Sequence, residues 1–137
     1  PLTAALAVVS RYYPKPVISN ITALFVHGLT DERIDVIDVD ISRQSSIRNK
    51  LMRPHRVNPK IIKGIEETTY NGIKVRVYSK ERAICDAYRF DPNGPIYLKA
   101  FKRYVKAGKI DANAIAAYDK LLKTDVLRSL MQELADA

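Results

Sequence analysis

Apolar side chains recur at helical spacing over residues 2–13, which predicts an amphipathic helix that ends before Pro14. A second, shorter buried helix is predicted after Ser19 or Asn20, either of which can act as its N-cap, and Gly28 closes it. The pattern therefore opens with two helices joined by a proline-containing turn.

The next stretch favours β-structure. From Arg33 to Ile41, five β-branched residues fall within nine positions, which predicts a largely buried strand. The apolar alternation slips between Val36 and Ile37, and this slip indicates either a bulge or burial of both faces.

The following segment is polar, and we expect mainly a loop there. A short helix is predicted around Ser45 to Met52, while Pro54 and Pro59 exclude a long one.

Asn71-Gly72 is the strongest hairpin signal in the chain, because it lies between two strand-like runs at residues 62–70 and 73–78. A two-residue type I′ turn pairs Tyr70 with Ile73 and Glu67 with Arg76. The second pair is of opposite charge, which supports this register.

The remainder of the chain is predicted to be helical. Ser79 caps a helix that runs to about Arg89, and a proline- and glycine-rich break at residues 91–95 follows it. Three more helices are predicted at residues 96–107, 112–122 and 126–135, with Gly108 ending the first, Asp111 capping the second, and Asp125 or Thr124 capping the third.

These elements predict an α+β fold. A small antiparallel or mixed sheet that includes the Asn-Gly hairpin is packed by the N-terminal helices and by a helical C-terminal half. The length of 137 residues fits one domain, residues 1–137, with a mixed part at 1–90 and a helical part at 96–137.

Composition excludes several classes of protein. No apolar run approaches the roughly 18 residues of a membrane-spanning helix, so no membrane partner is expected. Cys85 is the only cysteine and His27 and His55 are the only histidines, so we predict neither a disulfide nor a metal site, and no cofactor. A reducing, cytoplasmic location fits this cysteine usage.

The net charge of +8 is concentrated in one segment. Residues 41–65 contain no acid and carry seven of the eight excess positive charges, a segment named here the basic segment. Its cations are Arg43, Arg48, Lys50, Arg53, Arg56, Lys60 and Lys63. A second acid-free stretch, residues 92–110, adds Lys99, Lys102, Arg103 and Lys106 on one predicted helix. Such clustering favours DNA, RNA or an acidic protein surface as the partner, although a merely solvated face has the same composition.

Two alternatives for catalysis lie around the predicted strand. Asp38 and Asp40 follow Gly28 and share one face of the strand, as carboxylates that hold metal ions in nucleotidyltransferases do. Leu29 stands where that motif needs a second small residue, so a strand with a polar edge facing Arg or Lys neighbours is the simpler interpretation. A nuclease site that uses Asp40 and Glu66 lacks the closely spaced lysine that such sites need.

Most other polar candidates are best explained structurally. We expect His27 to bind backbone carbonyls, Cys85 to be buried and inert, and Arg82 to pair with Asp86 four residues along the same helix. No catalytic residue is predicted. The aromatic residues of the 96–107 helix are expected to pack in the core.

Two motifs together resemble AbiEi-type antitoxins. The first is Ile18-Ser19-Asn20-Ile21-Thr22-Ala23-Leu24-Phe25-Val26-His27-Gly28-Leu29-Thr30, and the second is Val77-Tyr78-Ser79-Lys80-Glu81-Arg82-Ala83-Ile84-Cys85-Asp86-Ala87. Their order and spacing are also similar to the family pattern. Ser19, His27, Gly28, Arg82 and Asp86 match its motif positions, and we expect them to be structural, with His27 and the Arg82–Asp86 pair bridging the two motif helices.

The resemblance implies a function. In that family a winged helix-turn-helix binds operator DNA, and the following domain opposes a nucleotidyltransferase toxin, in type IV toxin–antitoxin systems that serve abortive-infection phage defence. This chain resembles the C-terminal, antitoxic domain without the winged helix. The family implies transcriptional autoregulation by the full-length protein and action against the toxin without necessarily a stable complex.

The sequence thus leaves three hypotheses. The first is an antitoxic and regulatory domain, not an enzyme, that binds through its basic surface. The second is a divergent nucleotidyltransferase that uses Asp38, Asp40 and a metal ion. The third is a structural or oligomerisation module whose basic segment is only solvated.

Overall fold

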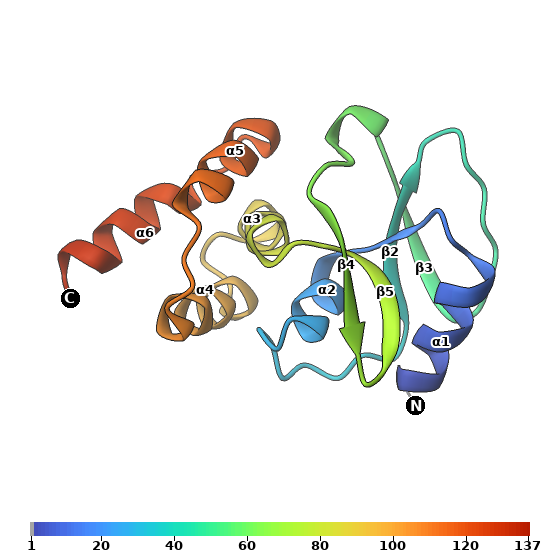
Figure 1. The fold of residues 1–137 in the computed structure, drawn as a ribbon. Helices are drawn as coiled ribbons and strands as arrows, with labels where there is room; N and C mark the ends of the chain where they lie inside the picture. Colours follow the sequence, from blue (N-terminus) through green and yellow to red (C-terminus); the bar gives the residue numbers. More distant parts are fainter. Residues whose placement is uncertain (1) are drawn as a thin grey trace.

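The computed structural model describes residues 2–137 and consists of helices around a five-stranded sheet (Figure 1). The helices are α1 (Leu2–Tyr12), α2 (Asn20–Val26), α3 (Lys80–Phe90), α4 (Pro95–Ala107), α5 (Ala112–Leu122) and α6 (Val126–Ala135), with a 3-10 turn, η1 (Pro59–Ile61). The strands are β1 (Val17–Ile18), β2 (Ile37–Ser42), β3 (Met52–Val57), β4 (Ile65–Tyr70) and β5 (Ile73–Tyr78). The predicted α+β class, with a mixed sheet and a helical C-terminal half, is confirmed.

The strands lie in the order β3-β2-β1-β5-β4, so β3 and β4 are the two edges. β2 pairs with β3 in parallel and β1 pairs with β5 in parallel, whereas the β1–β2 and β4–β5 pairs are antiparallel. The two parallel pairs join segments that the sequence pattern alone does not connect.

The Asn-Gly hairpin forms as predicted. Tyr70 lies opposite Ile73 and Glu67 lies opposite Arg76. Asn71 and Gly72 both have positive φ, 47° and 80°, which the type I′ turn requires.

Strand boundaries near the basic segment differ from the prediction. β2 begins at Ile37, not Arg33, because the regular ladder starts only where Ile37 pairs with Met52. From Ile37 to Ile41 every residue is buried, so the slip in alternation reflects burial of both faces.

The predicted short helix at Ser45 to Met52 is wrong, since residues 45–51 have no helix and β3 begins at Met52. The sequence reasoning missed β3 because Pro54 is unusual in a strand. An edge strand tolerates it, since one side of the strand has no ladder to complete.

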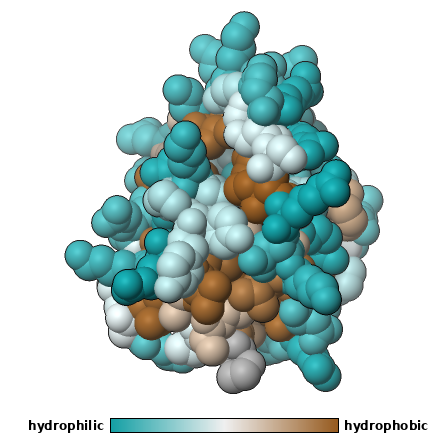
Figure 2. Space-filling view, turned by 90° about the vertical axis from the view of Figure 1, so that its right-hand side faces the viewer, coloured by the Kyte–Doolittle hydropathy of each residue, from teal (hydrophilic) through white to brown (hydrophobic). Residues whose placement is uncertain are grey.

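The sheet separates two hydrophobic layers. α1 covers one face, and α2 lies on the other, with α3 to α6 extending farther from the sheet on that side (Figure 1). The core includes Leu6 and Val9 of α1 and Leu24 of α2, each at most 3% exposed. Figure 2 shows the α1 side, where hydrophobic areas reach the surface between hydrophilic side chains; Val8 of α1 is 38% exposed.

The helical part follows the predicted boundaries closely, and side chains cap the starts of α3 and α5. Ser79 Oγ accepts a hydrogen bond from Arg82 N, and Asp111 Oδ1 accepts one from Ala114 N. Gly108 ends α4 with φ 78°.

The N-terminus of α6 is capped differently from the prediction. Asp125 occupies the cap position but its side chain makes no capping hydrogen bond. Instead the Asp119 carboxylate of α5 accepts hydrogen bonds from Val126 N, Leu127 N and the Thr124 hydroxyl. A partly buried side chain of α5 therefore fixes the start of the next helix.

In the part of the chain that the structure describes, no helix has the length and apolar character needed to cross a membrane.

Candidate binding site

A buried carboxylate organises the polar side of the sheet that faces α2. Asp38 on β2 is 2% exposed, and its Oδ1 accepts hydrogen bonds of 2.8 Å from both Arg53 Nε and His55 Nε2 on β3. The hydroxyl of Thr22 on α2 donates to Oδ2 over 3.4 Å and accepts from Asp38 N. The parallel register, with Asp38 opposite Arg53, produces this cluster.

The charges of this cluster balance locally. Hydrogen bonding to Asp38 and the charge of that carboxylate raise the pKa of Arg53. Arg53 nevertheless keeps a side chain that is 60% exposed, and that of His55 is 39% exposed. The expected polar strand edge facing a cation is thus confirmed at Asp38.

Asp40 and Tyr78 form a second buried pair beside the first. The Tyr78 hydroxyl donates to Asp40 Oδ2 over 2.8 Å, and neither residue is more than 4% exposed. Burial raises the pKa of Tyr78, and the charge of Asp40 raises it further. The phenol is therefore neutral and serves Asp40 as a hydrogen-bond donor.

Arg82 continues this network into α3. It has no exposed surface, its guanidinium lies 4.0 Å from the centre of the Tyr78 ring, and its Nε donates to Asp86 Oδ2 over 3.0 Å. Arg89 also donates to Asp86, over 2.9 Å. The predicted Arg82–Asp86 pair is confirmed.

The Arg82–Asp86 pair and His27, which were expected to bridge the two motif helices, make different contacts. Arg82 Nη1 donates to the carbonyls of Ile61 and Lys63. The Arg82–Asp86 pair therefore joins α3 to the connection between β3 and β4. The expectation that this pair bridges to α2 is wrong. His27 Nε2 donates to the carbonyl of Tyr78 over 2.8 Å. His27 therefore connects the end of α2 to the end of β5, two residues before α3 begins, and its expected carbonyl-binding role is confirmed.

A cavity of about 500 Å³ opens beside the Asp38 cluster. Its polar lining residues are Asn20, Asp38, Arg53 and His55 beside the cluster, together with Asp86 and Asp91. Its apolar lining comes from α2, the end of α3 and the start of α4: Ile21, Leu24, Ala87, Phe90, Pro95 and Ile96. Sequence reasoning missed this site, because Arg53 and His55 can be assigned to one strand face only once β3 is known.

Among residues 2–137, no group of three or more His, Cys, Asp and Glu side chains is placed to hold a metal ion. Asp38 faces two nitrogen donors and Asp40 faces the Tyr78 hydroxyl.

The basic segment surrounds edge strand β3. Arg53 and Arg56 lie on β3, Arg48 and Lys50 lie in the connection that leads into it, and Lys60 and Lys63 lie in the connection that follows. Arg43 follows β2 directly, and its N–H donates to Val57 O at the end of β3. The structure therefore gathers Arg43, Arg56 and Lys60 at one end of β3.

All seven of these cations are exposed. Within residues 2–137, the salt bridges include Arg53 but none of the other six. Their charges are available to a partner.

The α4 cations lie on a separate element. Lys99, Lys102 and Lys106 are exposed, whereas Arg103 is partly buried and pairs with Asp31 while donating to Gly28 O. Arg103 thus holds α4 against the loop after α2, and its role as a free binding cation is not supported by this geometry. Ile96 at the start of α4 and Arg53 of β3 both line the cavity beside Asp38.

Cys85 and the aromatic face of α4 are buried, as expected. Cys85 has no exposed surface, and burial raises the pKa of its thiol. Tyr97, Phe101 and Tyr104 are each at most 6% exposed and pack in the core.

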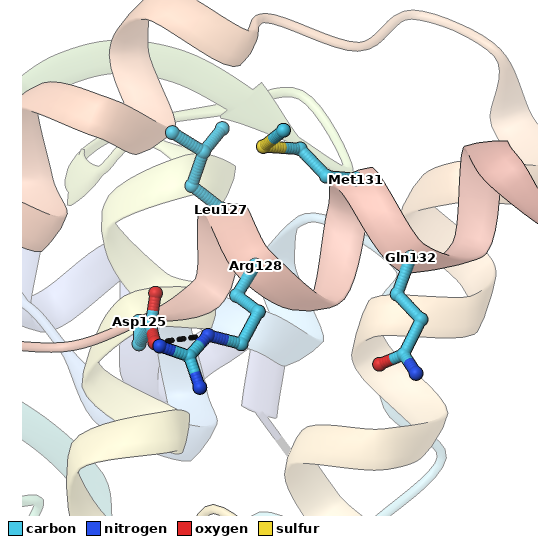
Figure 3. A pocket seen from close by; sticks show the side chains of 5 residues that line it. All are labelled: Asp125, Leu127, Arg128, Met131 and Gln132. Atoms are coloured by element: carbon cyan, nitrogen blue, oxygen red, sulfur yellow. Dashed lines mark ion pairs between the residues drawn. The ribbon is translucent and has the colours of Figure 1, made fainter.

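A second hollow lies on α6 and has a different character. Figure 3 shows its lining, Asp125, Leu127, Arg128, Met131 and Gln132, which comes from one helix, with Leu127 and Met131 on one side of that helix and Gln132 on the other. Arg128 pairs with Asp125 over 2.9 Å. No predicted site residue lies there, and the cavity beside Asp38 is the better candidate because its polar groups converge from several elements.

No protein-family model matches the chain, and no curated protein sequence matches it.

Proposed function

We propose that this domain acts by binding a nucleic-acid backbone along β3, as the antitoxic and regulatory domain of an AbiEi-like antitoxin. The observation that carries the proposal is the group of seven exposed cations around this edge strand, of which Arg53 alone forms a salt bridge within residues 2–137. The two sequence motifs supply the antitoxin assignment, and the buried contacts of His27 and Arg82 agree with structural roles for the motif positions.

The edge of the sheet formed by β3 and the basic segment around it, named here the cationic edge, carries Arg53 and Arg56 on the strand itself, and its length suits contact with a phosphate backbone. Six residues of β3 extend about 20 Å at roughly 3.3 Å per residue. One strand of B-form DNA places about six phosphates along that length, at roughly 3.4 Å each. The same cations and Pro54 also keep β3 from pairing with another sheet edge.

The partner on this proposal is DNA or RNA, and the opposing nucleotidyltransferase toxin is countered without a requirement for a stable complex. The domain needs no cofactor and works in the cytoplasm, where a thiol such as Cys85 stays reduced.

Co-expression with the cognate nucleotidyltransferase toxin tests this function. We expect the 137-residue chain to restore growth, and the double variant Arg43→Glu/Arg56→Glu to lose that rescue. Lys15→Glu/Lys120→Glu is the matched control, since it removes the same charge from exposed positions outside the basic segment. Equal rescue by both double variants would show that the cationic edge is not the acting surface.

A further inference from the structure

The cavity beside Asp38 combines a polar end, which contains Arg53 and His55, with an apolar body. Arg53 and His55 are fixed at that end because both donate to the same buried oxygen, Asp38 Oδ1. The Arg53 side chain is 60% exposed, and its Nε and Nη2 donate to Asp38, so its remaining N–H groups can bind a ligand anion while Asp38 holds its orientation. This arrangement favours a ligand whose charged group is negative and compact, such as a phosphate.

The remainder of the cavity favours a flat apolar group. Ile21, Leu24, Ala87 and Ile96 line it, and Phe90 stands at its rim with 92% of its surface exposed. An exposed aromatic ring next to an apolar slot is the arrangement on which unpaired bases stack. The volume of about 500 Å³ falls in the usual range for small-molecule sites.

Arg53 belongs to both surfaces. It lines the cavity and lies on β3 among the other cations of the basic segment. A strand whose phosphates follow β3 therefore reaches the cavity without leaving the protein surface.

We propose that this cavity binds one unpaired nucleotide, with its phosphate at Arg53 and His55 and its base against Phe90 and the apolar wall. The nucleotide belongs to the nucleic acid held along β3, so the proposal rests on the proposed function and names its substrate class: a nucleic acid with a single-stranded end, loop or flipped base.

The test uses adenosine monophosphate as the probe and backbone-amide NMR of the full chain as the readout. We expect shifts at Ile21, Ala87 and Phe90 on titration. Adenosine, inorganic phosphate and benzoate are the comparison probes, and each should bind at least about fivefold more weakly, because each lacks one of the two recognised groups or the sugar that spaces them.

Three variants locate the site. Phe90→Ser changes an exposed side chain, so the fold is retained, and it should weaken nucleotide binding at least about fivefold. Ala87→Leu fills the cavity and should weaken binding further. Lys120→Glu lies outside both the cavity and the basic segment and should leave binding of the mononucleotide unchanged.

The outcomes separate this proposal from the proposed function. Absence of shifts at the cavity residues, equal binding of benzoate, or unchanged binding by Phe90→Ser and Ala87→Leu would each overturn the nucleotide site. Binding of duplex DNA is measured in parallel. Loss of this binding in Arg43→Glu supports phosphate binding by the cationic edge, independently of the result for the cavity. Nucleotide binding without any duplex binding would instead refute the proposal that the cationic edge binds phosphates and would leave the proposed nucleotide site standing.

Discussion

Arg82 is a charged side chain with no exposed surface, and its environment meets most of its hydrogen-bonding needs. It donates to Asp86 and to two backbone carbonyls, and it lies over the Tyr78 ring. Such a buried charge matters for the stability of the fold mainly because its removal leaves its partners unpaired inside the protein.

Replacing Arg82 by alanine is therefore expected to destabilise the fold by about 3–5 kcal/mol, the usual cost of removing one partner of a buried ion pair. Urea denaturation measures it. Arg89→Ala is the matched control, because Arg89 binds the same Asp86 from a side chain that is 41% exposed, and it should cost about 1 kcal/mol or less. Equal losses in the two variants would contradict the role of burial.

Asp31 offers a test at a surface pair. The hydrogen bond from Arg103 and the charge of that arginine lower the pKa of Asp31 below its usual value. The pair thus favours folding above the ordinary carboxyl pKa, and this contribution is lost as the pH falls through the lowered value.

We expect Arg103→Gln to raise the pKa of Asp31 toward its ordinary value, measured by NMR titration of the carboxyl group. Lys106→Gln removes the same charge from α4 and should leave the Asp31 pKa unchanged. An Asp31 pKa that stays low without Arg103 would contradict the pairing.

For individual side chains, the sequence predicts only partners that lie close together along the chain. The Arg82–Asp86 pair is four residues apart on one helix and could be predicted. The Asp38–Arg53–His55 cluster could not, because it depends on a parallel pairing between strands whose register no local rule fixes.

Among the elements, α5 and α6 share a capping side chain. Asp119 of α5 accepts hydrogen bonds from the first two backbone N–H groups of α6, whereas Asp125 at the cap position makes no such bond. The first turn of α6 thus depends on a residue from the preceding helix.

Asp119→Ala should destabilise the chain by about 1–2 kcal/mol, the cost of losing a cap, with the loss concentrated in α6. Amide hydrogen exchange of residues 126–130 and thermal unfolding measure it. Asp125→Ala removes only an exposed pair with Arg128 and should cost about 0.5 kcal/mol or less. A larger effect at Asp125 than at Asp119 would restore the sequence-based assignment of the cap.

Elements with strong local signals were predicted well, and those that depend on distant pairing were not. The hairpin at Asn71-Gly72 and the helices after Ser79 carry turn and capping residues that specify them locally. The sequence of β3 alone resembles a loop because it contains Pro54. The strand forms because it pairs with β2 in parallel, and this pairing cannot be predicted from the sequence of β3.

In the whole molecule, the fold determines which surface the basic segment forms. Along the sequence it is a run of 25 residues without an acid. In the structure it follows one sheet edge and contributes Arg53 and His55 to the cavity beside Asp38. The cations of α4 are less closely tied to that edge, and Arg103 is engaged in packing α4.

The central claim is that cations along β3 bind phosphates, and the salt dependence of binding to a labelled DNA duplex tests it most directly. Fluorescence anisotropy across a range of salt gives the slope of log affinity against log salt for the wild-type chain, for Arg43→Glu/Arg56→Glu and for the control Lys15→Glu/Lys120→Glu. We predict that the first variant loses about one unit of slope for each cation replaced, while the control keeps the wild-type slope. Equal slopes for the two variants, or no salt-dependent binding by the wild-type chain, would contradict the account.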